Sequence, residues 1–279
     1  MTGPQIHHPF PPERFLPYLT TSDVAALPKE DALVVLPIAS IEQHGPHLPL
    51  ASDTLLGQTI IGRALERLDP DDQVWVLPNL AYGKSNEHRS FPGTITLSQA
   101  TLAAVVAEIA TAVAAAGFRR LALVNSHGGN PAVLEYVARD THEKTGLIIF
   151  PLFMFRMGVD YGEEPEDEAH WGTHAGDWET SALLAIAPEL VHMDRTVDLE
   201  PYPSYPRPVR HLTLRGAVTF AWLTGELSVA GNLGDPRRAT LERGERIIEG
   251  TVARLAEVLR EMATFEMPRP GGTGHHAGR

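Results

Sequence analysis

Four short apolar runs recur along the chain, at 32–38, 73–80, 119–126 and 146–155. Val, Leu and Ile dominate them, as in strands that are buried on both faces of a sheet. A segment with helical spacing precedes each later run. The alternation of helix and strand predicts an α/β fold, a three-layer α/β/α sandwich with a mainly parallel central sheet.

The clearest helical segment lies before the third run. Ser98 is suited to cap its start, and Gly117 is suited to end it. Helical spacing places five apolar residues on one face: Leu102, Val105, Val106, Ile109 and Val113. This face is expected to pack on the sheet.

The second half of the chain is less regular. An acidic stretch at 156–176 precedes a predicted helix in HAGDWETSALLAIA, and 195–234 is rich in Pro and Gly. A last long helix is predicted to begin at Asp235-Pro236. Its apolar stripe comprises Leu241, Ile248, Val252, Leu255, Leu259 and Met262. We expect a single domain over 1–279 with a flexible tail at about 268–279.

Composition narrows the possible partners. The formal net charge of −12 argues against nucleic acid or an anionic membrane as a partner and favours a small molecule. The absence of cysteine excludes disulfides, thiolate metal ligands and a cysteine nucleophile. The first residues lack a basic segment followed by an apolar run, so we expect a cytoplasmic protein.

Acidic and histidine side chains follow all four apolar runs. In open α/β sheets, ligands bind beyond the carboxyl ends of the strands. In chain order these residues are Glu42, His44 and Asp53; Glu87 and His88; His127; and His174, Asp177 and Glu179. The pattern predicts a polar site at this edge of the sheet.

The loop IASIEQHGPHLPLASD carries the first group. In an extended segment, Glu42 and His44 project to the same side, as two metal ligands would. Asp53 precedes an apolar helix expected at 55–68, where it would either bridge two ions or cap the helix. The alternative for Glu42 and His44 is a hydrogen-bonded pair, and His47 is expected to play a supporting or structural role.

The turn SHGGNP carries the second group. His127 stands at a strand tip, and the Gly128 and Gly129 amides could hold an anion or a developing oxyanion. Asn130 before Pro131 also fits an ordinary strand-to-helix turn with its cap. No Lys-Ser or Lys-Thr follows, so the turn is not a nucleotide-binding loop.

HAGDWETS carries the third group. Asp177 lies about one helical turn after His174 and is expected to orient its imidazole. Glu179 is expected to point into the site. The alternative for both acids is a favourable interaction with the helix dipole.

The ligand set Glu42, His44, Asp53, His127 and Glu179 suits Zn²⁺, Mn²⁺ or Fe²⁺. Three carboxylates against two divalent cations leave one positive charge, which a bridging hydroxide would cancel. Such a hydroxide is the nucleophile of many hydrolases. His174 would then be free to move the proton.

Four segments, IASIEQHGPHLPLASD, YGKSNEHRSFPGTITL, NSHGGN and HAGDWETS, resemble the motif set of the creatininase family, over roughly residues 33–195. The resemblance implies a single three-layer α/β/α domain, a cyclic homo-oligomer such as a hexamer, and a two-metal site that hydrolyses C–N bonds in cyclic or formyl amides. The positions matching family metal ligands are Glu42, His44, Asp53 and His127, with Asp53 as the bridge. His174 matches the catalytic histidine.

This sequence departs from true creatininase at several positions. Creatininase has a glutamate ligand where this chain has Gly129, so Glu179 is the expected replacement. Phe153 stands where a tryptophan is expected, and Trp171 is displaced by one position. With Gly128 and Gly129, these two aromatic residues are expected to bind substrate, but creatinine itself is a doubtful one.

The leading hypothesis is therefore a metal-dependent amidohydrolase acting on a small amide. Within the family, one alternative is a deformylase of a formylaminopyrimidine nucleotide, for which only Lys84 and Arg89 are obvious basic residues near the site. Another is a hydrolase that trims a peptide. An inactive metal-binding scaffold is the alternative from a different class.

Overall fold

The computed structural model describes residues 9–163, 165–207, 209–215 and 218–268. A parallel sheet of four strands lies at its centre. The strands are β1 (Leu33–Ile38), β2 (Val74–Val76), β3 (Arg120–Asn125) and β4 (Ile148–Phe153), in the order β2-β1-β3-β4. The first residue of β1 pairs with the first residues of β2 and β3, and Arg120 with Ile148. The predicted parallel sheet is confirmed, although β2 is shorter than the apolar run at 73–80.

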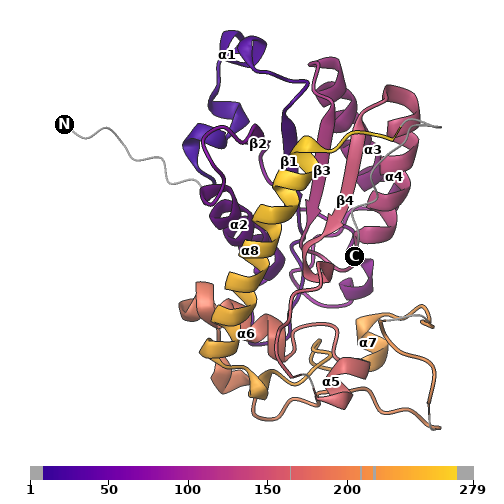
Figure 1. Ribbon diagram of the computed structural model, residues 1–279. Coiled ribbons are helices and arrows are strands. Elements are labelled where there is room, and N and C mark those ends of the chain that lie inside the picture. Colours follow the sequence, from indigo (N-terminus) through magenta and orange to yellow (C-terminus); the bar gives the residue numbers. More distant parts are fainter. Residues whose placement is uncertain (1–8, 164, 208, 216–217, 269–279) are drawn as a thin grey trace.

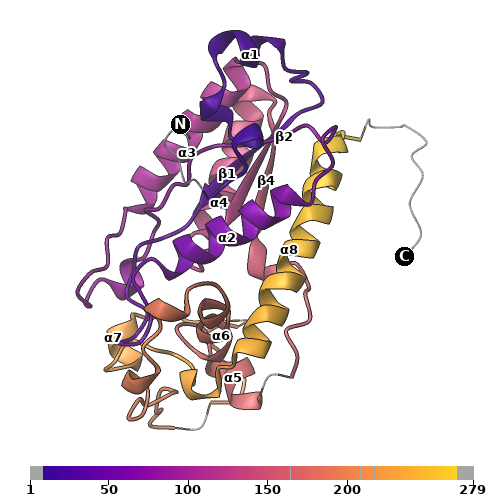
Figure 2. The same ribbon diagram turned by 90° about the vertical axis from the view of Figure 1, so that its left-hand side faces the viewer.

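Helices cover both faces of the sheet (Figures 1 and 2). On one face, α2 (Ser52–Glu66), α6 (Asp177–Ile186) and α8 (Leu241–Thr264) pack with alternate strand residues such as Leu33 and Val35. On the other, α3 (Gln99–Ala115) and α4 (Pro131–Thr145) pack with Val34 and Leu36. Because successive side chains of a strand point to opposite faces, the apolar runs supply both cores. The three-layer α/β/α prediction is confirmed.

The ends of α3 follow the predicted signals. The Ser98 hydroxyl accepts a hydrogen bond from the backbone N–H of Thr101, which caps the start of the helix. Gly117 follows the end of the helix with a φ of 93°, a conformation that favours glycine. The local sequence therefore determines both ends of α3.

The predicted start of the last helix is wrong. Asp235 caps only a short 3₁₀ turn at Pro236–Arg238, and Ala239 then adopts an extended backbone. The helix α8 begins at Leu241. Thr240 caps it, because its side chain accepts a hydrogen bond from the Arg243 N–H. Leu241 is 53% exposed, whereas the buried stripe comprises Ile248, Val252, Leu255 and Leu259.

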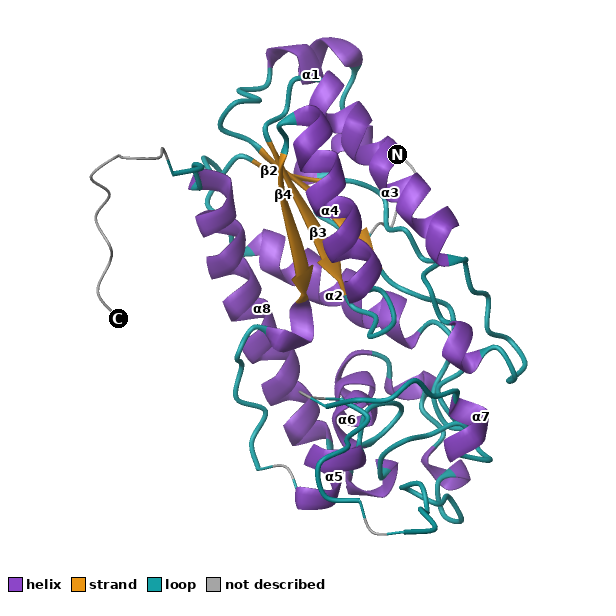
Figure 3. Cartoon of the chain, turned by 90° about the vertical axis from the view of Figure 1, so that its right-hand side faces the viewer, coloured by secondary structure: helices purple, strands orange, loops and turns teal. Residues whose placement is uncertain are grey.

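The remaining short helices are α1 (Thr21–Ala26), α5 (Glu166–Trp171) and α7 (Thr224–Leu227). The last two and their loops lie beyond the carboxyl ends of the strands, next to α6 (Figure 3). An antiparallel bridge between His174 and Leu233 joins the loop after α5 to the loop after α7. The predicted flexible tail falls largely on 269–279, outside the described residues. Within the described ranges, no helix combines the length and apolar character needed to cross a membrane.

Candidate metal centre

Side chains from four parts of the chain converge at the carboxyl edge of the sheet. Two come from the loop after β1, one from the first turn of α2, one from the loop after β3 and one from the first turn of α6. All are at most 5% exposed: Glu42, His44, Asp53, His127 and Glu179. The structure thus brings together the five predicted metal ligands.

Asp53 lies between the two imidazoles of this group. Its Oδ2 is 3.0 Å from His127 Nδ1, and its Oδ1 is 3.6 Å from His44 Nε2. The helix cap is Ala51, so the alternative of Asp53 as the N-cap is wrong. The two oxygens of this carboxylate therefore face different imidazoles.

Backbone carbonyls determine which ring nitrogen of each histidine faces the carboxylates. His44 Nδ1 donates to the Glu42 carbonyl at 3.1 Å, and His127 Nε2 donates to the Lys84 carbonyl at 2.9 Å. A carbonyl only accepts, so these nitrogens carry protons, and His44 Nε2 and His127 Nδ1 are the lone-pair donors of the neutral rings. Histidines that bind metals are usually oriented in this way.

Two atoms of the group lack hydrogen-bond partners. Glu42 Oε2 and His44 Nε2 are buried and make no hydrogen bond within the described part of the chain. A buried polar atom without a partner is destabilising. Divalent cations would satisfy both atoms, and a set of carboxylate and imidazole ligands fits Zn²⁺, Mn²⁺ or Fe²⁺.

Ionisation within the group reflects burial and close charges. Burial alone would lower the pKa of His44, but the nearby carboxylate of Asp53 raises it to about 9. Burial opposes ionisation of Asp53, yet His127 and His44 hold its pKa below the usual range. Burial raises the pKa of Glu179 to about 7. Without cations, protons therefore occupy part of the site.

Glu179 is oriented by an unusual backbone conformation. Its Oε2 accepts a hydrogen bond from the Ala175 N–H. Ala175 is buried and has a φ of 52°, a left-handed conformation that is costly for any residue other than glycine. Glu179 forms one compact group with His44 and His174, and Glu42 forms another with Asp53 and His127.

His174 lies beside the ligands but is not oriented by Asp177. Its Nε2 donates to the Gln43 carbonyl at 2.7 Å, which leaves Nδ1 unprotonated and 3.7 Å from Glu42 Oε1. The Asp177 carboxylate instead pairs with Arg243 at 2.5 Å and accepts from the Ser181 hydroxyl at 3.2 Å. The predicted orienting role of Asp177 is wrong, because its partner comes from α8.

Sequence reasoning noted His88 without a role and missed Gln43. The Gln43 amide nitrogen lies 2.8 Å from His88 Nδ1, and the Gly45 N–H and Gly231 carbonyl determine the orientation of that amide. An amide nitrogen only donates, so His88 carries its proton on Nε2, 3.5 Å from Glu42 Oε1. His88 also forms a compact group with Glu42 and His174. Its Nε2, however, carries a proton and faces Glu42, so this nitrogen is not free to bind a cation.

His47 is fully buried but lies outside the candidate ligand groups found among the described residues. Its Nε2 is 3.0 Å from the Thr180 hydroxyl. Burial and the neighbouring His44 lower its pKa to about 4, so the ring is neutral at pH 7. His47 connects the loop after β1 to α6, in agreement with the predicted structural role.

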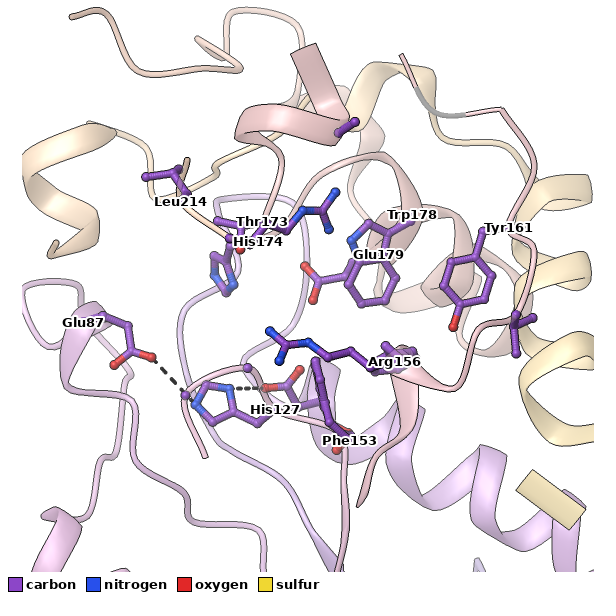
Figure 4. A pocket seen from close by; sticks show the side chains of 18 of the residues that line it. Glu87, His127, Phe153, Arg156, Tyr161, Thr173, His174, Trp178, Glu179 and Leu214 are labelled. Carbon is purple, nitrogen blue, oxygen red and sulfur yellow. Dashed lines mark hydrogen bonds and ion pairs between the residues drawn. The ribbon is translucent and has the colours of Figure 1, made fainter. Parts of the chain in front are cut away.

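A pocket of about 860 Å³ opens onto this centre (Figure 4). Gly128, Gly129 and Phe153 line it, as predicted. Trp171 is not among the lining residues, because its ring packs against Tyr205 with the ring centroids 4.8 Å apart. Trp178 instead forms part of the pocket wall, next to Glu179.

The structure also explains why position 129 carries a glycine and not an acidic ligand. A Cβ atom at this position would lie 2.2 Å from the Lys84 carbonyl oxygen and 2.5 Å from Glu87 Oε1. No larger side chain fits there without movement of the backbone around Lys84. Position 129 therefore offers no carboxylate, and Glu179 is the acid in the group with His44.

Similarity to known proteins agrees with this geometry. The family model described as "Creatininase: Creatinine amidohydrolase" matches residues 17–259. A relative from Mycobacterium ulcerans named mycofactocin precursor peptide peptidase is 36% identical, over 85% of this chain and 90% of its own. The creatinine amidohydrolase of Pseudomonas putida is 31% identical, over 83% and 90%.

Solved creatininase structures have the same fold. A mutant creatininase described as the Zn-Zn type has a TM-score of 0.73 at 29% identity and covers 90% of this chain and 98% of its own. A structure described as creatininase Mn has a TM-score of 0.69 at 29% identity, with coverage of 90% and 99%. The extent of these matches, together with the motifs and the geometry, shows that the chain belongs to the creatininase family.

Proposed function

We propose that this creatininase-family amidohydrolase cleaves the C–N bond of a small or cyclic amide with the help of two divalent cations, Zn²⁺, Mn²⁺ or Fe²⁺. One observation carries the proposal. Asp53 directs one carboxylate oxygen toward His127 and the other toward His44, at 3.0 and 3.6 Å, within a buried group of ligands. This arrangement supports two adjacent cation sites that would share one carboxylate.

The ligands divide between the two sites. Glu42 and His127 would hold one cation and His44 and Glu179 the other, with Asp53 common to both. When bound, such a pair of cations polarises a carbonyl and lowers the pKa of a water molecule. His88 keeps Glu42 in place, and the Gln43 carbonyl keeps His174 Nδ1 directed at the site.

His174 is the proposed proton carrier. Burial and the neighbouring His88 and His44 lower its pKa, so the imidazole is neutral at pH 7. Its unprotonated Nδ1 can take a proton from the attacking water and deliver it to the departing nitrogen. The Gly128 and Gly129 amides, in the pocket wall, would hold the oxygen that gains charge during attack.

A second candidate substrate is an amide bond of a peptide. The mycobacterial relative at 36% identity is named as a peptide peptidase. The pocket of about 860 Å³ is also within the range that holds a ligand much larger than a single small ring. Short peptides therefore belong in the substrate panel beside lactams, cyclic ureides and formamides.

The first test compares metal-loaded wild type with His174→Ala across this panel. We expect wild type to hydrolyse at least one class of amide. The variant should retain bound metal and lose about 10²- to 10⁴-fold in turnover, the usual contribution of a general acid or base. His192→Ala is the matched control, because His192 is exposed and lies outside the site. Full activity of His174→Ala would refute the assigned role.

A further inference from the structure

Three arginines line the pocket, and two of them have protein partners. Arg243 pairs with Asp177 at 2.5 Å, and Arg215 donates to the Glu168 carbonyl at 3.3 Å. The guanidinium of Arg156 has no hydrogen bond or ion pair with any residue that the structure describes. It lies over the Phe153 ring, 5.4 Å from the ring centroid.

The fold directs Arg156 into the pocket. It ends the 3₁₀ turn Met154–Arg156, directly after β4, and the fully buried Met154 anchors this turn in the core. Figure 4 shows the side chain extending into the pocket, with its guanidinium toward the space between Glu179, His174 and His127. Arg156 therefore lies where it can reach a molecule bound at the metal centre.

The ligand set does not need Arg156 to neutralise its charge. Three carboxylates, two divalent cations and a bridging hydroxide sum to zero. Glu87 and Asp160 also line the pocket, but neither pairs with this guanidinium among the described residues. Because arginine binds carboxylate and phosphate groups through two parallel hydrogen bonds, an unpaired guanidinium beside the metal centre suits an anionic ligand.

We propose that Arg156 is a specificity-determining residue that binds an anionic group of the substrate, a carboxylate or a phosphate carried by the same molecule as the scissile amide. This inference rests on the proposed function and names the substrate class within it. The enzyme would favour an amide with an attached anion over a neutral lactam or cyclic urea. The aromatic ring of Phe153 would keep the guanidinium in position through a cation–π contact.

The test measures binding and needs no turnover. Phenylacetate, phenyl phosphate and the neutral phenylacetamide are titrated into the metal-loaded protein. Tryptophan fluorescence reports binding, because Trp178 and Trp222 line the pocket. The variants are Arg156→Gln, which removes the charge, and Arg156→Lys, which keeps it. Arg254→Gln is the matched control, since Arg254 is exposed on α8 and its ion pair, among the described residues, is with Glu257 at 3.6 Å.

We expect Arg156→Gln to weaken binding of an anionic probe by about 10- to 100-fold, the usual effect of losing a charged hydrogen-bond partner. Affinity for phenylacetamide should not change, Arg156→Lys should be intermediate, and Arg254→Gln should match wild type. A loss confined to phenyl phosphate would identify the anion as a phosphate, and a loss confined to phenylacetate would identify it as a carboxylate.

Two results would overturn the inference: unchanged anion affinity in Arg156→Gln, or an equal loss for phenylacetamide. Either result, with amide hydrolysis intact in wild type, would refute the role of Arg156 and leave the proposed function standing. Absence of hydrolysis by the loaded wild type would instead refute the proposed function, whatever the binding result.

Discussion

At the scale of single residues, backbone carbonyls control the chemistry of the site. His44, His127 and His174 each donate one ring N–H to a main-chain carbonyl, so the other nitrogen faces the carboxylates. The fold thereby determines which nitrogen of each ring is left to bind a cation once the ring is neutral. This preorganisation avoids reorienting the imidazoles when the site is loaded.

Metal affinity should rise with pH. A cation can bind His44 Nε2 only after that nitrogen loses its proton, and in the metal-free protein the pKa of His44 is raised to about 9. Below that pH the cation that binds His44 must displace this proton, so its affinity should increase about tenfold per pH unit up to about pH 9. Glu179, with a pKa raised to about 7, should steepen the rise below pH 7. Competition with a chelator at several pH values measures this, and a flat profile would contradict it.

Residue types and their place after the strands were sufficient to predict that the five proposed ligands lie together. The roles of other residues depend on partners that are distant in sequence. Asp177 is close to His174 along the chain, but it pairs with Arg243 of α8. His88 and Gln43 could be assigned only once their mutual hydrogen bond fixed the proton positions.

At the scale of the element, the turn between β3 and α4 carries two glycines with different constraints. A Cβ at Gly129 would collide with the Lys84 carbonyl, whereas a Cβ at Gly128 would have no atom within 4 Å. The turn therefore needs glycine at one position for close packing and leaves the other open to the pocket.

Gly129→Ala should lower the free energy of unfolding by about 1–3 kcal/mol, the usual cost of forcing an extra carbon into a packed site. Gly128→Ala should cost much less and serves as the matched control. Chemical denaturation of both variants measures the difference. Equal stability of the two would show that the loop of Lys84 moves freely, contrary to the packing described here.

At the scale of the whole molecule, α8 joins the parts that carry the site. It packs against α2, which bears Asp53, and against α6, which bears Glu179. Its stripe was predictable from helical spacing, and the order of strands and helices predicted the layers around a parallel sheet. The start of α8 was not predictable, because the Asp235-Pro236 signal belongs to a separate 3₁₀ turn.

Leu259→Ala should therefore destabilise the protein by about 2–5 kcal/mol, because Leu259 is fully buried in the core beneath α8. Leu241→Ala should change stability by no more than about 0.5 kcal/mol, since Leu241 is 53% exposed at the helix start. Thermal or chemical unfolding compares the two. A large cost at Leu241 would contradict the observed start of α8.

The most direct test of the central claim is the metal content of the purified, reconstituted protein, measured by elemental analysis. The two-cation account predicts two divalent ions per chain in wild type and loss of most of both in Asp53→Ala, because Asp53 faces both sites. Asp71→Ala, at an exposed position far from the pocket lining, should keep two. Two retained ions in Asp53→Ala, or fewer than two in wild type, would contradict the account.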